Sequence, residues 1–372
     1  TPGFAGCTFG SPELNATGLT STSHRPASRL PVEEATRPYG TRYYWRVRAC
    51  DAYRCGAWSA VRYLDVGRAP NDFDGDGYSD VLLGAPRHGT NGEGRISLYL
   101  GAASPGAVVV ATMDGQTHVA AVGDLLGESV AGAGDVNGDG YADFLAGARN
   151  APISPAGDGR AYLFLGGATP NLVADVTYVP TVAGGGLGRS VAGAGDIDAD
   201  GFADVIVGAR NASSNAGRAY VFLGGSSPDA VADVELAPAS AGEQFGGAVA
   251  GAGDVNADGF GDVVVGAIVW SAASGRAYLF LGGAPMDTTY DALSAGSAAG
   301  TNHGWSVSAA GDFNDDGIAD WVVGAPGGAT VGGVAEVYYG GTPPDSTRDL
   351  LFSSADDQFG SAVARAGDVD GD

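Results

Sequence analysis

The stretch D-F-D-G-D-G-Y-S-D, Asp72 to Asp80, decides the fold of this chain because the same frame returns along the sequence. It recurs as D-V-N-G-D-G-Y-A-D from Asp135, D-I-D-A-D-G-F-A-D from Asp196, D-V-N-A-D-G-F-G-D from Asp254 and D-F-N-D-D-G-I-A-D from Asp312. A sixth copy begins at Asp368, and the sequence ends inside it. A motif that returns at intervals of about 60 residues indicates a repeat architecture.

Each copy has the form D-x-[DN]-x-D-G-x-x-D, with side-chain oxygens at positions 1, 3, 5 and 9. Such a set of oxygens suits a hard cation such as Ca²⁺, and we expect position 7 to add a backbone carbonyl. The motif is not an EF-hand, because Leu83 and Ala146 stand at position 12 of the first two copies, where that motif needs a glutamate. A single Asp-rich turn is equally consistent with an Asx-turn that binds nothing, but five copies in register favour calcium.

The predicted calcium ligands are the residues at positions 1, 3, 5, 7 and 9 of the loops. They are Asp72, Asp74, Asp76, Tyr78, Asp80, Asp135, Asn137, Asp139, Tyr141, Asp143, Asp196, Asp198, Asp200, Phe202, Asp204, Asp254, Asn256, Asp258, Phe260, Asp262, Asp312, Asn314, Asp316, Ile318, Asp320, Asp368, Asp370 and Asp372. The loops that begin at Asp72 and Asp196 carry Asp at position 3, whereas the next three have Asn there. We therefore predict tighter binding at the two all-Asp loops.

The composition is acidic, with a net charge of −24 over 372 residues and 43 acidic side chains. Nearly half of these side chains lie in the predicted loops, so the charge is largely a property of the metal sites. The acidity argues against nucleic-acid binding, and no apolar run reaches the length of a membrane span. All 19 basic residues are Arg, which excludes chemistry that depends on a lysine in this chain.

From residue 69 onward each unit contains four short apolar stretches separated by glycine-rich turns. In the second unit these stretches are Leu126–Gly134, Phe144–Ala148, Arg160–Leu165 and Ala174–Val179. Four strands per unit at a nearly constant period predict an all-β fold, a β-propeller of four-stranded blades with about five blades in this chain. The first unit lacks its first strand, and Gln358–Gly367 is a first strand alone. That strand could complete the first blade, precede further blades, or be completed by another molecule.

The repeats resemble a known family. F-G-G-A-V-A-G-A-G-D (Phe245 to Asp254), D-V-V-V-G-A (Asp262 to Ala267) and L-L-G-A-P (Leu82 to Pro86) are similar to the FG-GAP repeat of the integrin α-subunit propeller and its bacterial relatives. The resemblance covers residues 69–372. It implies calcium in the loops, an extracellular setting, either secreted or on the cell surface, and a role in adhesion or ligand binding.

Residues 1–68 lack the Asp loop and form a separate predicted domain. Tyr43, Trp45 and Val47 alternate with polar residues, and residues 37–66 resemble the last two strands of a fibronectin type III domain, a partial β-sandwich. Cys50 and Cys55 are predicted to form a disulfide across this hairpin, which favours an oxidising compartment.

No catalytic motif is evident, and the four histidines occupy unrelated positions that favour surface or loop sites. We therefore predict a secreted, non-enzymatic, calcium-binding module for adhesion or extracellular structure, with a protein or glycan ligand. One alternative is a fibre subunit that binds copies of itself head to tail through the incomplete blade. Another is a glycan-binding lectin.

Overall fold

The structure of this chain is a computed structural model that describes residues 37–39, 41–45, 62–66, 71–103, 109–116, 123–151, 158–181, 185–327, 332–354 and 358–366. Within these ranges the protein is almost entirely β-structure, with one short helical segment, α1 (Ala212–Asn215). The cysteines and the loop from Asp368 to Asp372 lie outside the described residues.

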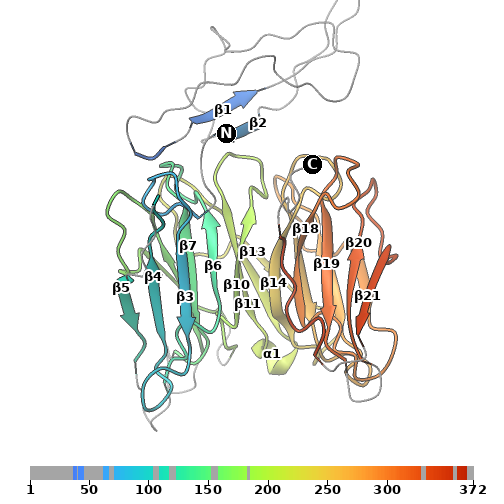
Figure 1. The fold of residues 1–372 in the computed structure, drawn as a ribbon. Helices are drawn as coiled ribbons and strands as arrows, with labels where there is room; N and C mark the ends of the chain where they lie inside the picture. Colours follow the sequence, from blue (N-terminus) through green and yellow to red (C-terminus); the bar gives the residue numbers. More distant parts are fainter. Residues whose placement is uncertain are drawn as a thin grey trace, which may run out of the picture.

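The strands form a β-propeller, as the repeat predicted (Figure 1). Four of its sheets are four-stranded and antiparallel, and the first has three strands. Blade 1 comprises β3 (Val81–Ala85), β4 (Arg95–Tyr99) and β5 (Val109–Asp114); blade 2 comprises β6 (Val130–Gly134), β7 (Asp143–Ala148), β8 (Arg160–Phe164) and β9 (Val176–Tyr178); blade 3 comprises β10 (Ser190–Gly195), β11 (Asp204–Ala209), β12 (Arg218–Phe222) and β13 (Val234–Leu236); blade 4 comprises β14 (Phe245–Gly253), β15 (Asp262–Ala267), β16 (Arg276–Phe280) and β17 (Ala292–Ala295); blade 5 comprises β18 (Ser306–Gly311), β19 (Asp320–Ala325), β20 (Gly333–Tyr338) and β21 (Leu350–Ser354).

Aromatic side chains from the outer strands fill the space between blades. Tyr178 on β9 of blade 2 packs on Phe222 on β12 of blade 3, with ring centroids 4.1 Å apart. The second strands β7, β11 and β15 are buried along their whole length because sheets cover both of their faces. Small residues predominate in the inner strands, such as S-V-A-G-A-G in β10, which suits the crowded centre of the propeller.

Glycine allows the backbones of successive blades to touch. A Cβ atom added to Gly208, the glycine of the G-A-R stretch in blade 3, would lie 2.1 Å from the carbonyl oxygen of Gly246 in blade 4. Gly147 has the same relation to Gly188, and Gly266 to Gly304, at 1.9 and 2.0 Å. Gly246 itself has φ +78°, a conformation that side chains disfavour. The two glycines for which the FG-GAP repeat is named therefore meet between neighbouring blades.

The first blade has an open inner edge. β3 pairs only with β4 among the described residues, so no inner strand covers it. Val81 and Leu83 on β3 are 50% and 52% exposed, whereas Val205 and Val207 at the matching positions of β11 are fully buried. The predicted incomplete first unit is thus confirmed, and it leaves apolar strand surface uncovered.

His303 lies in the connection between β17 and β18, as the prediction of a surface or loop site allows, but it is completely buried. It occupies the position of Phe245 in the preceding repeat, because Gly217 bridges Phe245 and Gly275 bridges His303. Its Nε2 lies 2.8 Å from the hydroxyl of Ser294, and its Nδ1 lies 3.6 Å from Glu336. Burial lowers the pKa of His303 to about 4. His303 and Glu336 take the positions that the aromatic pair Phe245 and Tyr278 occupies in the preceding blade. The repeat pattern therefore does not predict this polar site.

Two strands precede the propeller. β1 (Thr41–Trp45) and β2 (Arg62–Val66) pair antiparallel, with Tyr43 opposite Leu64. They are drawn beyond the upper end of the blades in Figure 1. This pairing agrees with the predicted hairpin, while the predicted sandwich around it lies outside the described residues.

The contact between glycines yields a direct test. Replacing Gly208 by Ala should lower the free energy of unfolding by about 3 kcal/mol, because the added methyl group meets a backbone oxygen that cannot move alone. Gly225→Ala is the matched control, since nothing lies within 4 Å of its Cβ position and its φ is not left-handed. Urea unfolding in saturating calcium measures both. Equal stability of the two variants would contradict the packing described here.

Candidate metal centres

The Asp loops lie together at one end of the propeller. In blades 2 to 5 each loop joins the inner strand to the second strand of its blade, as residues 196–203 join β10 to β11, and the loop from Asp72 directly precedes β3. Because the inner strands β6, β10, β14 and β18 all end at this side, the loops from Asp135, Asp196, Asp254 and Asp312 follow one another around it. This is the upper end in Figure 1, and we call it the loop face.

Three carboxylates converge in each of the two all-Asp loops. Asp72, Asp74 and Asp80 each offer an oxygen within 4.8 Å of the others, and so do the three residues Asp196, Asp198 and Asp204. Two unit charges about 4 Å apart repel by about 4 kcal/mol at an effective dielectric constant near 20. A bound divalent cation would turn this repulsion into attraction, so the donor set fits calcium.

Backbone amides hold the first carboxylate of the loop in place. Asp72 accepts hydrogen bonds from the amides of Asp76 at 2.9 Å and Gly77 at 2.8 Å. Asp196 accepts the same pair of bonds from Asp200 and Gly201, each at 3.0 Å. Because these amides lie four and five residues after the carboxylate that accepts from them, the bonds close the loop around its first residue without any ion.

The ninth residue of each loop is a buried aspartate held at both oxygens. Asp204 accepts from the amide of Ile197 at 2.6 Å and from that of Gly224 at 2.7 Å. The corresponding residues of the other loops, Asp80, Asp143, Asp262 and Asp320, each accept an equivalent pair. Each therefore ties its loop to the turn that follows the third strand.

Burial raises the pKa of these aspartates. It raises the pKa of Asp143 and Asp262 to about 7 and that of Asp204 to about 8, and nearby loop carboxylates add to the effect. No arginine pairs with these three side chains in the part of the chain that the structure describes. A buried carboxylate without a cationic partner is costly, and a metal ion in the loop would supply the missing positive charge.

The third position is asparagine in the other three complete loops. The Asn137 side-chain amide donates to Asp139 at 2.9 Å, and Asn256 donates to Asp258 at 2.8 Å. The amide thereby replaces one charge repulsion with a hydrogen bond. Its carbonyl oxygen remains a suitable calcium ligand, but the loop has one negative charge fewer.

Successive loops are joined to each other. The amide of Ala203 donates to the carbonyl of Asp135 in the preceding loop at 3.0 Å, and Ala319 donates to Asp254 at 3.2 Å. The aromatic residue at position 7 also covers the preceding loop, since a Cβ at Gly138 would lie 2.5 Å from the ring of Phe202. The geometry of one loop therefore constrains that of its neighbour.

Two arginines of the N-terminal segment reach the loop face, and sequence reasoning missed both. Arg37 lies 2.8 Å from Asp74 and 3.7 Å from Asp76. Arg42 on β1 lies 3.5 Å from Asp135 and donates to the carbonyl of Gly201 at 2.9 Å. No repeat contains these residues, so only the three-dimensional arrangement shows that they balance loop charge.

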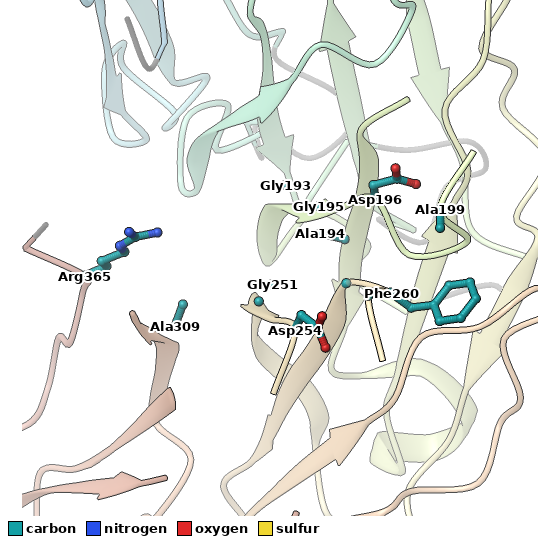
Figure 2. A pocket seen from close by; sticks show the side chains of 13 residues that line it. Gly193, Ala194, Gly195, Asp196, Ala199, Gly251, Asp254, Phe260, Ala309 and Arg365 are labelled. Atoms are coloured by element: carbon teal, nitrogen blue, oxygen red, sulfur yellow. The ribbon is translucent and has the colours of Figure 1, made fainter. Parts of the chain in front are cut away.

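A depression of about 450 Å³ opens between the inner strands β10, β14 and β18 beside the loops (Figure 2). Glycine and alanine form most of its wall. Asp196 and Asp254 contribute carboxylates, and Arg365 projects toward it from the segment after β21 (Figure 2). The lining combines both signs of charge beside two candidate metal loops.

Comparison with known proteins supports the family that the sequence resembles. Residues 69–99, 126–164 and 187–222 match the model described as FG-GAP repeat. These three segments of the chain are similar to FG-GAP repeats. Integrin alpha-IIb of Mus musculus is 35% identical over 151 residues, which are 38% of this chain and 14% of that protein. Integrin alpha-4 of Xenopus laevis is 31% identical over 159 residues, 40% of this chain and again 14% of the relative.

The matched FG-GAP segments correspond to the first three blades, and this chain spans only a small part of either integrin. The fibronectin type III resemblance of the N-terminal segment finds no support among these matches and stays a prediction. No helix in the described ranges is long and apolar enough to cross a membrane.

The difference between the two kinds of loop can be tested by exchange. Asp198→Asn should weaken calcium binding at the third loop roughly tenfold, and Asn256→Asp should strengthen it at the fourth by a similar factor, because one carboxylate is lost or gained. The amide signals of Gly201 and Gly259 in a calcium titration followed by NMR report the two loops separately. The signal of Gly140 in the second loop is the internal control. Unchanged affinities at both loops would refute the role assigned to position 3.

Proposed function

We propose that this chain is an extracellular, non-enzymatic adhesion module whose propeller is stabilised by calcium and binds a protein or glycan ligand at the loop face. The observation that carries the proposal is the convergence of three carboxylates in two loops of the loop face, one of which borders a depression of mixed charge. The FG-GAP matches and the integrin relatives support it, since that family implies adhesion.

Calcium acts structurally in this proposal. If each of five loops is occupied at ten times its dissociation constant, linkage contributes about 1.4 kcal/mol per site, or roughly 7 kcal/mol in all. That sum is comparable to the whole stability of a domain. Millimolar calcium of the extracellular space suits sites of modest affinity, which supports an extracellular location.

One arrangement between the fourth and fifth blades resembles catalytic machinery. His303 lies between the hydroxyl of Ser294 and the carboxylate of Glu336 in space, as the histidine of a hydrolase triad lies between its serine and its acid. All three are buried, however, with His303 completely inaccessible. Glu336 is also bound by Arg348 at 2.6 Å and by the hydroxyl of Tyr338 at 2.7 Å. A substrate could not reach the serine, so the group is a polar part of the core, in keeping with a non-enzymatic role.

The test is a binding screen with the chain immobilised in millimolar calcium. We expect capture of a matrix protein or a glycan, loss of capture on chelation, and weaker capture by Arg365→Gln, because Arg365 lines the depression. Arg218→Gln is the matched control, since Arg218 pairs with Glu235 on the outer part of blade 3. Capture that persists unchanged in Arg365→Gln would place the ligand elsewhere. Capture of no ligand in calcium would contradict the adhesion role.

A second candidate function is self-assembly, which the open edge of β3 favours. The segment Gln358–Arg365 carries the sequence of an inner strand, and its Phe359 is 41% exposed. If this segment of one molecule paired with β3 of the next, head-to-tail contacts would build a filament. Electron microscopy of the calcium-loaded chain should then show filaments that disappear on chelation. Single particles in both conditions would rule this candidate out.

A further inference from the structure

Three arginines gather at the end of the propeller opposite the loop face. Arg149 follows β7 and Arg210 follows β11, while Arg189 directly precedes β10. Second strands run away from the Asp loops and inner strands run toward them, so all three residues lie at the far end. In Figure 1 this is the lower end, where α1 is drawn. We call these residues the arginine cluster.

The sequence of the repeat changes where the cluster arises. Blades 1 and 5 have G-A-P at the end of the second strand, Gly84–Pro86 and Gly324–Pro326, as the repeat prescribes. Blades 2 and 3 have G-A-R-N instead, Gly147–Asn150 and Gly208–Asn211. Arginine thus replaces proline in two adjacent blades, which brings two guanidinium groups to the same end of the propeller.

One carboxylate faces these three cations. Oε2 of Glu128 lies 2.5 Å from Nε of Arg149, and its Oε1 lies 3.3 Å from Nη1 of Arg189. Arg210 donates instead to the neutral side chain of Gln244 at 2.6 Å. No second carboxylate pairs with the cluster within the ranges that the structure describes. The cluster therefore has two positive charges in excess, in a chain whose net charge is −24.

The cluster also has unused hydrogen-bonding capacity. Nε of Arg189 is buried and has no hydrogen-bond partner, and Nε of Arg149 is close to Glu128 without forming a hydrogen bond. Burial, followed by repulsion from Arg189 and Arg149, lowers the pKa of Arg210. Like charges that are partly shielded from water repel strongly, and an anion placed among them would relieve the repulsion.

We propose that Arg149, Arg189 and Arg210 form a binding site for a tetrahedral oxyanion with two negative charges, such as a phosphate monoester or free sulfate. Guanidinium groups match such anions in shape and donate paired hydrogen bonds to their oxygens. A dianion balances the excess charge of the cluster, whereas a monoanion leaves half of it. The site is separate from the loop face and does not depend on calcium or on the proposed adhesion function.

Calorimetric titration of the calcium-loaded chain at pH 8 and constant ionic strength tests the proposal. Three probes are used: methyl phosphate, which is a dianion at this pH; methyl sulfate, which is a monoanion of the same shape; and inorganic sulfate. We expect methyl phosphate to bind roughly tenfold more tightly than methyl sulfate. Binding of inorganic sulfate without methyl phosphate would identify the ligand as a free anion, and binding of both would allow an esterified one. Equal or undetectable binding of all three probes would overturn the proposal.

Two variants give opposite expectations for methyl phosphate. Arg189→Gln should weaken its binding roughly tenfold, since one cation is lost, and Glu128→Gln should tighten it, since the competing carboxylate is neutralised. Arg218→Gln, in the outer part of blade 3, should leave the affinity unchanged. Calcium-dependent thermal unfolding confirms that each variant is folded. If Glu128→Gln failed to tighten the binding of methyl phosphate, the cluster would be a structural feature only. This result decides the question even if Arg189→Gln could not fold.

Discussion

The buried aspartate at the ninth position of each loop is the constraint on which the rest of the structure depends. Asp204 shows it most clearly, because it accepts one hydrogen bond from its own loop and one from the turn after the third strand. The Asp204 carboxylate thus joins β11, its own loop and the turn after β12, and it is completely buried. No cationic side chain lies beside it among the described residues and burial raises its pKa to about 8, so a cation in the loop would stabilise the ionised carboxylate.

The two ends of each blade are held by different interactions, and both act between neighbours. At the loop face, amides such as that of Ala203 bind the preceding loop. At the opposite end, glycines such as Gly208 and Gly246 bring the backbones of adjacent blades into contact. The hydroxyl oxygens of Ser129 and Ser190 accept hydrogen bonds from the amides of Val191 and Val249 in the next blade. Stability is therefore shared along the row of blades, as in other repeat proteins.

The sequence predicts the parts of this structure that repeat. The Asp frame, the glycine pairs and the apolar strands recur with fixed spacing, so the blades, their four strands and the convergent carboxylates could all be derived from it. The features that occur once could not. Arg37 and Arg42 reach the loops from a segment outside the repeat, and His303 is buried because its partners Ser294 and Glu336 changed together with it. Such positions depend on contacts between distant residues, which the pattern of one strand does not contain.

Native mass spectrometry of the purified chain tests most directly whether the carboxylate loops hold calcium. We expect a folded species with an ion in each of the five complete loops when calcium is present. We also expect that chelation removes these ions and lowers the unfolding temperature. A folded chain that carries no calcium and unfolds at the same temperature with and without chelator would contradict calcium binding by the loops.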